Sequence, residues 1–203
     1  SLEAPRFARS ENLLEAFSAS GLAALGVATP EVFWGRIVGP TWTEGSTTTI
    51  GYKRILAERI ESLCLAPGAP FAEMAEAASR FVDLYLAHSP IDPLWRPLLE
   101  RLAGNPAAAV LIATDHYAEA TEAIIHRLRS WNIPAQKAQQ GTDPFPPFPF
   151  LIANSADIGF WKEDRRFWEV LKLQLRPETI RSLLFIDDFG FNEEAGDCYG
   201  RRV

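Results

Sequence analysis

Two adjacent carboxylates follow an apolar run near the C-terminus of the chain. Leu183–Ile186 leads directly into Asp187 and Asp188, and Asn192 follows in a short acidic segment. Such a run, bounded by polar residues, is typical of a strand buried on both faces of a parallel sheet. Ligands bind beyond the carboxyl ends of such strands, and carboxylate oxygens suit Mg²⁺. The pattern predicts either a magnesium site or a solvated turn whose aspartate caps a helix.

Two earlier apolar runs also end in polar residues. Ala107–Ala113 is followed by Thr114, and Phe150–Ala153 is followed by Asn154, with Lys162 further on. In a parallel sheet these ends meet at one edge, where they would join the two carboxylates. A hydroxyl, an ammonium and a Mg²⁺ site together suit phosphate handling, because each stabilises charge on phosphoryl oxygens.

Four polar residues next to these strand ends are further candidates for substrate contacts or for supporting roles. They are Asp115, Asn154, Ser155 and Asn192.

The elements that would position these residues change in character along the chain. Apolar spacing predicts helices over 52–65 and 71–88, with a loop around Gly39–Gly45 between earlier helical segments. After residue 106, strands alternate with helices over 117–131 and 164–175. This order predicts an α/β fold with a Rossmann-like parallel sheet and right-handed crossovers. We therefore expect a helical domain over residues 1–92 and an α/β domain over residues 93–203.

Composition excludes several classes of function. The 203 residues carry a net charge of -6, which argues against a nucleic-acid partner. The two cysteines are too few for a disulfide framework. The apolar runs fall short of the ~20 residues that span a bilayer, and the N-terminus has no signal-peptide pattern. We expect a soluble cytoplasmic protein with no membrane partner.

Three segments resemble motifs of the haloacid dehalogenase-like superfamily of phosphatases and related hydrolases. Val110–Thr114 is similar to the family's second motif, an apolar strand ending in Thr or Ser. Phe160–Asp164 is similar to the third, a Lys shortly before a helix. Leu184–Asp188 is similar to the fourth, an apolar strand ending in paired acids. The order and spacing fit over about the C-terminal half of the chain.

The resemblance implies a role for each matching residue. Thr114 would hold a phosphoryl oxygen, Lys162 would steady the phosphorylated intermediate, and Asp187 and Asp188 would hold Mg²⁺. The substrate would be a small phosphorylated molecule. The helical half resembles the cap that many members insert between the first and second motifs.

The family's first motif is not found in this sequence. That motif, Asp-x-Asp-x-Thr or Val, supplies the nucleophile and the general acid, and no Asp-x-Asp occurs in the chain. Its strand lies at the centre of the family's sheet, between those of the second and fourth motifs. An unfilled slot would leave unpaired backbone groups at a cost of about 1–3 kcal/mol each.

Three arrangements would fill the central position. The motif could lie on an N-terminal segment that this sequence omits, or the two flanking strands could pair directly. Alternatively, the β-branched stretch Thr47–Ile50 could take the place of the missing strand. The first is the arrangement that we favour, because the resemblance begins abruptly with cap-like helix. Asp115 and Asp157 are the first acids to test as replacement nucleophiles.

Two functions from different classes remain. The first is a Mg²⁺-dependent phosphatase-like hydrolase, complete only with a nucleophile segment. The second is a catalytically inactive module that keeps the fold for binding or regulation.

Overall fold

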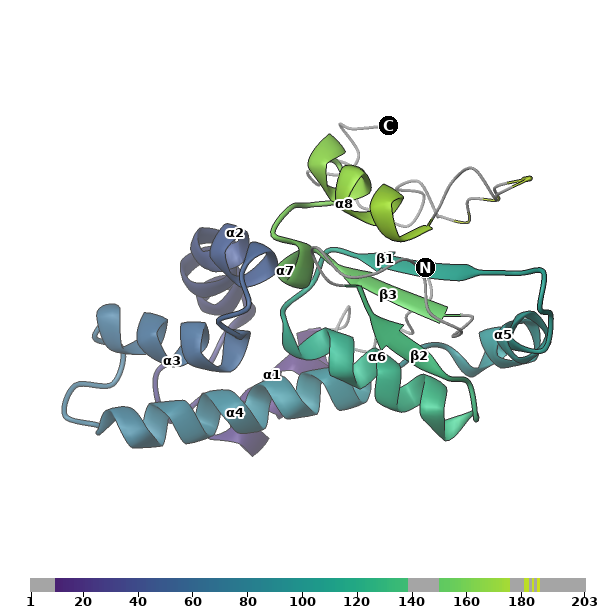
Figure 1. Ribbon diagram of the computed structural model, residues 1–203. Coiled ribbons are helices and arrows are strands. Elements are labelled where there is room, and N and C mark those ends of the chain that lie inside the picture. The colour runs from purple at the N-terminus through teal and green to yellow at the C-terminus, as the bar shows by residue number, and fades with distance from the viewer. Residues whose placement is uncertain (1–9, 139–149, 176–180, 183, 185, 187–203) are drawn as a thin grey trace.

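The computed structural model describes residues 10–138 and 150–175, together with Arg181, Ser182, Leu184 and Ile186. Helices form the first half of the described chain, and a parallel sheet flanked by helices forms the second (Figure 1). In chain order the elements are α1 (Ser10–Ser20), the π-helix η2 (Val32–Val38), α2 (Gly39–Thr47), α3 (Tyr52–Ser62), α4 (Phe71–His88), the 3₁₀ turn η3 (Pro93–Trp95), α5 (Arg96–Ala103), β1 (Val110–Thr114), α6 (Glu119–Ser130), β2 (Ala135–Lys137), β3 (Phe150–Asn154), α7 (Ser155–Ile158) and α8 (Arg165–Leu175).

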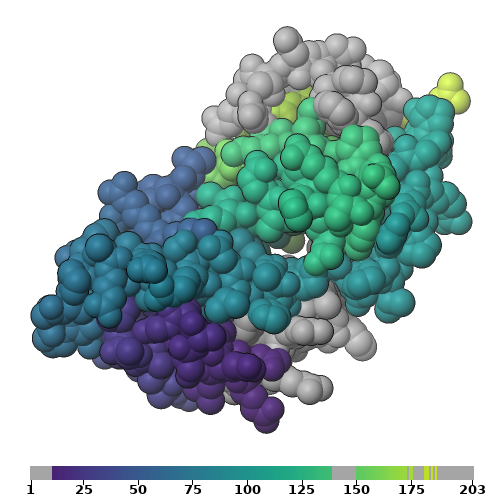
Figure 2. Space-filling model, turned by 90° about the horizontal axis from the view of Figure 1, so that it is seen from below, coloured from purple at the N-terminus to yellow at the C-terminus, as the bar shows by residue number. Residues whose placement is uncertain are grey.

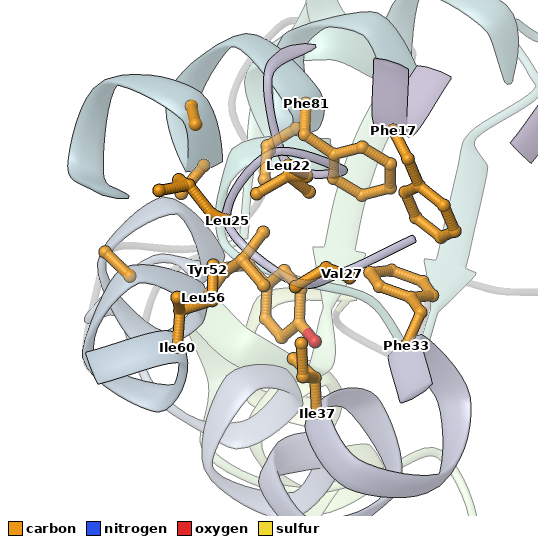
Figure 3. Close-up of a cluster of buried hydrophobic side chains, with 14 of the residues drawn as sticks. Phe17, Leu22, Leu25, Val27, Phe33, Ile37, Tyr52, Leu56, Ile60 and Phe81 are labelled. Atoms are coloured by element: carbon orange, nitrogen blue, oxygen red, sulfur yellow. The ribbon is translucent and has the colours of Figure 1, made fainter. Parts of the chain in front are cut away.

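The helical half has its own apolar core, drawn from α1, η2, α3 and α4 (Figure 3). Phe17, Phe33 and Phe81 form a cluster whose ring centroids lie 5.2, 5.6 and 5.0 Å apart. Aromatic pairs at such distances add about 0.5–1.5 kcal/mol each beyond the area they bury. The cluster therefore fixes three helical segments against one another.

The sheet has the order β1-β3-β2, and both pairings are parallel. Every residue of β3 is buried. One face packs Ile112 and Ile152 against Leu128 of α6, and the other packs Leu151 against Phe167 of α8. Helices thus cover both faces of the sheet (Figure 1), which explains why the strands are continuous apolar runs.

The loop before α6 and the first turn of α6 contact the helical half. The Glu119 carboxylate accepts hydrogen bonds from the amides of Tyr52 and Lys53 at the start of α3, at 2.9 and 3.0 Å. The rings of Tyr52 and Tyr117 stack with centroids 3.8 Å apart. Viewed from below, α6 in green lies against α4 in teal, with α1 in purple on the far side of α4 (Figure 2).

The coarse fold prediction is confirmed. The chain is mixed α/β with a small parallel sheet, and strands occur at both β1 and β3 as expected. Helices occupy Tyr52–Ser62, Phe71–His88, Glu119–Ser130 and Arg165–Leu175, close to the predicted bounds. The division at residue 92 and the finer family assignment stay predictions.

The predicted loop around Gly39–Gly45 is wrong, because these residues lie in helix α2. Gly39 and Pro40 stand where α2 continues directly from η2, and the Gly39 amide donates to the carbonyl of Trp34, five residues before it. The Thr41 hydroxyl donates to the carbonyl of Ile37 at 2.7 Å, the fourth residue before it. The helical run therefore continues from η2 through the two residues that were expected to interrupt it.

The proposal that Thr47–Ile50 forms a substitute strand is also wrong. Thr47 ends α2, and a turn follows it. The hydroxyls of Thr47 and Thr48 donate to the carbonyls of Thr43 and Glu44, at 2.6 and 2.8 Å. These bonds to carbonyls four residues back favour the last turn of a helix over an extended ladder.

The strand expected at 183–187 is not found at the positions that the structure describes. Leu184 and Ile186 are outside any strand and are 81% and 62% exposed. Asp187, Asp188 and Asn192 lie outside the described residues.

Within the described ranges, no helix has both the length and the apolar character needed to cross a membrane.

Candidate functional site

The carboxyl ends of β1 and β3 bring two of the predicted residues side by side. The register pairs Thr114 with Asn154, the last residue of each strand. Thr114 is half-buried, whereas Asn154 has no exposed surface. The strand alternation in the sequence thus correctly predicted that these two ends share one edge.

Asn154 acts on the loop after β1. Its Oδ1 accepts a hydrogen bond from the His116 amide at 3.1 Å, and its Nδ2 donates to the Tyr117 carbonyl at 2.8 Å. The Ser155 hydroxyl accepts from the same His116 amide at 3.2 Å, and Ser155 is also fully buried. Of the two roles considered for Asn154 and Ser155, burial favours support of the loop over contact with a substrate.

Asp115 connects the end of β1 to the segment that carries Lys162. Asp115 Oδ1 accepts a hydrogen bond from the Lys162 amide at 2.9 Å. Burial raises the pKa of the Asp115 carboxyl, and nearby Glu163 raises it further. The Lys162 amide, the Lys162 charge and a hydrogen bond from Ser155 lower the pKa but do not cancel the effect of burial. Lys162 therefore lies at the same edge as Thr114, as the sequence predicted for its segment.

The carbonyl of Lys162 is bound as well. Trp168 of α8 donates its indole Nε1–H to this oxygen at 2.7 Å. The neighbouring Trp161 donates its own Nε1–H to the Ser46 hydroxyl of α2, also at 2.7 Å. Three side chains from three parts of the fold hold this short irregular segment in place.

A buried charged cluster lies beside the site; the sequence marked Asp157 and Asn154 but not the contacts that join them to Lys137 and Thr121. The side chain of Asp157 is 1% exposed and forms an ion pair with Lys137 of β2. Asp157 Oδ2 accepts from the Thr121 hydroxyl at 2.5 Å, while Oδ1 contacts the Lys137 ammonium without a well-directed hydrogen bond. Asn154 Nδ2 donates to the same Thr121 hydroxyl at 3.1 Å. No short motif signals such a cluster, since its members come from four separate elements.

The burial of Asp157 decides one of the predicted alternatives. A nucleophilic carboxylate must reach the reacting atom, and this one is enclosed and already paired. Asp157 is therefore unsuited to replace the missing nucleophile. Asp115 remains as the described acid next to Thr114.

A shallow hollow of about 530 Å³ opens between α2 and the segment that carries Lys162. Its wall combines hydroxyl, aromatic, acidic and guanidinium groups from Thr43, Thr47, Gly159, Phe160, Trp161, Glu163, Asp164 and Arg166. The Arg166 guanidinium lies over the Phe160 ring, 4.2 Å from its centroid, and is bound to Asp164 at 2.6 Å. The lining of the hollow therefore combines aromatic surface with polar groups.

His116 is enclosed by the aromatic groups that join the two halves. Its Nδ1 accepts from the Tyr117 amide at 2.8 Å, and its ring lies beside those of Tyr85 and Tyr117. Burial lowers the pKa of His116 to about 4, and burial also raises the pKa of Tyr117. At neutral pH the imidazole is uncharged and serves packing.

The described residues do not form a magnesium site by themselves. Across residues 10–138, 150–175 and the four described positions that follow, no three His, Cys, Asp or Glu side chains lie close enough together to hold an ion. Asp115 Oδ1 is already bound to the Lys162 amide. The predicted ligands Asp187 and Asp188 lie outside the described residues, so a Mg²⁺ site stays a prediction.

Comparison with known proteins adds no relative to this picture. No family model, no curated protein and no solved structure matches the chain.

Proposed function

We propose that the chain is the phosphate-handling part of a Mg²⁺-dependent hydrolase that resembles haloacid dehalogenase-like phosphatases and acts on a small phosphorylated molecule. One observation carries the proposal: β1 and β3 pair in parallel with Thr114 at their common end, where Asp115 binds the Lys162 amide. A hydroxyl at this edge, and an ammonium carried by the segment bound there, would suit the charge that develops on a transferring phosphoryl group.

Each residue would contribute a separate interaction. The Thr114 hydroxyl would donate a hydrogen bond to a phosphoryl oxygen, and the Lys162 ammonium would neutralise its charge. Asp187 and Asp188 would hold Mg²⁺, which when bound offsets further phosphate charge. The rest of the substrate would lie in the hollow between α2 and the Lys162 segment, against Trp161.

The chemistry also needs a nucleophile, and no Asp-x-Asp of this sequence supplies one. Loss of the catalytic nucleophile costs about a millionfold in turnover in a well-studied hydrolase. We therefore expect the 203-residue chain to hydrolyse p-nitrophenyl phosphate no faster than its Asp187→Ala variant. A version extended by a segment that carries Asp-x-Asp should turn over in Mg²⁺ and lose activity in chelator.

The opposite result has a clear meaning. Turnover by the 203-residue chain that is abolished by Asp187→Ala, and restored when Mg²⁺ is added back to chelated protein, would contradict the assignment. It would show that the chain holds its own nucleophile. Asp115→Asn would then be the first variant to test.

A second function is favoured by the absence of Asp-x-Asp from the sequence. A catalytically inactive module could keep Thr114 and Lys162 to bind a phosphorylated partner molecule. It would bind inorganic phosphate in a Lys162-dependent manner, yet the extended version would show no turnover. Because phosphate binding is expected of both functions, turnover by the extended version is the measurement that separates them.

A further inference from the structure

The peptide of Lys162 is held at both of its hydrogen-bonding groups. Its amide donates to Asp115 Oδ1 at 2.9 Å, and its carbonyl accepts from Trp168 Nε1 at 2.7 Å. Both bonds come from side chains of other elements, one after β1 and one in α8. The segment itself lies between α7 and α8 and has no regular ladder of its own.

The residue before Lys162 is held as well, by the bond from Trp161 Nε1 to the Ser46 hydroxyl. A loop lysine on the surface normally needs no such support, because its long side chain is solvated and its main chain bonds to water. Three side-chain hydrogen bonds at two consecutive residues therefore fix the backbone position from which the flexible Lys162 side chain extends. A fixed backbone position lowers the conformational entropy that is lost when the Lys162 ammonium binds an anion.

We propose that Asp115 and Trp168 are positioning residues that hold the Lys162 main chain so that its ammonium meets a phosphate at the end of β1. The inference rests on the proposed function for the phosphate itself. It goes further by assigning roles to two residues that contact Lys162 rather than the ligand. In this assignment Asp115 acts through its acceptor oxygen and not through its charge.

The roles of charge and acceptor can be separated by two substitutions at one position. Asp115→Asn keeps an acceptor oxygen at the same place and removes the charge, whereas Asp115→Ala removes both. Trp168→Phe keeps an aromatic ring but loses the donor to the Lys162 carbonyl. Glu169→Gln is the matched control on α8, because Glu169 is exposed and pairs with Arg165.

The measurement is the dissociation constant for inorganic phosphate at neutral pH, followed by ³¹P NMR on the whole chain. We expect binding that Lys162→Met abolishes. Asp115→Ala and Trp168→Phe should each weaken binding about three- to tenfold, the factor that the net worth of one hydrogen bond supports. Asp115→Asn should bind as well as wild type or better, and Glu169→Gln should be unchanged. Amide hydrogen exchange at Lys162 should accelerate in Asp115→Ala and remain slow in Asp115→Asn.

Each other outcome overturns a distinct statement. If phosphate binds through Lys162 but Asp115→Ala and Trp168→Phe bind it as tightly as wild type, the positioning roles are wrong and the proposed function stands. If Asp115→Asn loses binding as fully as Asp115→Ala, the carboxylate charge matters and the acceptor role is wrong. If the wild type binds no phosphate, or binds it equally with Lys162→Met, the proposed function fails and the inference with it. If Asp115→Ala does not fold, Trp168→Phe decides, since the Trp168 side chain is partly exposed.

Discussion

At the residue scale, Gly51 shows how closely the two halves of the chain approach. Its φ of +91° lies in the region that side chains rarely adopt, and an added Cβ would lie 2.9 Å from Glu119 Oε1. We expect Gly51→Ala to lower the free energy of unfolding by about 1–3 kcal/mol, the usual cost of such backbone strain. Gly35→Ala is the matched control: Gly35 lies in η2 with open space around it, and alanine is the better helix former. Equal urea midpoints for the two variants would contradict this account.

His116 links stability to pH at the same scale. Burial lowers the pKa of His116 to about 4 in the folded chain, against 6.5 for a free imidazole. Between these pH values the imidazole of the unfolded chain binds a proton and that of the folded chain does not. The free energy of unfolding therefore decreases as the pH falls. The contribution of His116 to stability is constant well above pH 6.5 and should fall by up to about 1.4 kcal/mol per pH unit between 6.5 and 4.

The His116→Asn variant isolates this effect. Asparagine keeps an acceptor near the position of Nδ1, which binds the Tyr117 amide, but it does not titrate. The free energy of unfolding, measured by urea at several pH values, should therefore fall less steeply with acid in His116→Asn than in wild type. A difference between the two proteins that stays constant from pH 7 to pH 4 would rule out His116 as the source.

At the scale of elements, Glu119 caps a helix that is distant in sequence. Its two oxygens accept the first amides of α3, which lie 67 and 66 residues earlier. A carboxylate at a helix N-terminus satisfies orphan donors and interacts favourably with the helix dipole. We expect Glu119→Ala to cost about 1–2 kcal/mol of stability, whereas Glu122→Ala, an exposed change on the same helix, should cost less than half of that. Denaturant unfolding of both variants tests this, and similar losses would show that the cap is not the stabilising interaction.

The same elements show what the sequence could predict. The run Phe150–Ala153 and the apolar spacing of 71–88 identified β3 and α4, because local pattern determines both. Helix α2 was missed because Gly39 and Pro40 favour a turn unless they stand at a helix start, and that start depends on the preceding π-helix.

The candidate site also has parts that the sequence pattern predicts and parts that only the folded chain shows. Thr114 and Lys162 follow from strand order, since parallel strands end at one edge. The bonds that hold them do not follow, because Asp115, Trp168 and Ser46 find their partners only in the folded chain. No periodicity or short spacing encodes contacts of that kind, so the bonds came from the structure, although the sequence had already marked Asp115 as a candidate.

At the scale of the whole molecule, metal binding depends on how many oxygen ligands the chain can bring together. Mg²⁺ requires near-octahedral coordination and keeps waters when protein ligands are few. Asp187 and Asp188 are the predicted ligands, and the family's first motif, which would add others, is not in the sequence. Among the described residues, Asp115 is the acid at the strand edge, and one of its oxygens is already bound by the Lys162 amide.

We therefore expect the chain to bind Mg²⁺ weakly. Titration calorimetry should show a dissociation constant in the millimolar range or no binding, and Asp187→Asn should abolish any heat that is seen. Asp92→Asn is a suitable control, because Asp92 caps the η3 turn through the Leu94 amide and lies outside the proposed site. Micromolar affinity would contradict this expectation, since two carboxylates and water do not hold Mg²⁺ so tightly. Loss of that affinity in Asp115→Asn would then identify Asp115 as the further ligand.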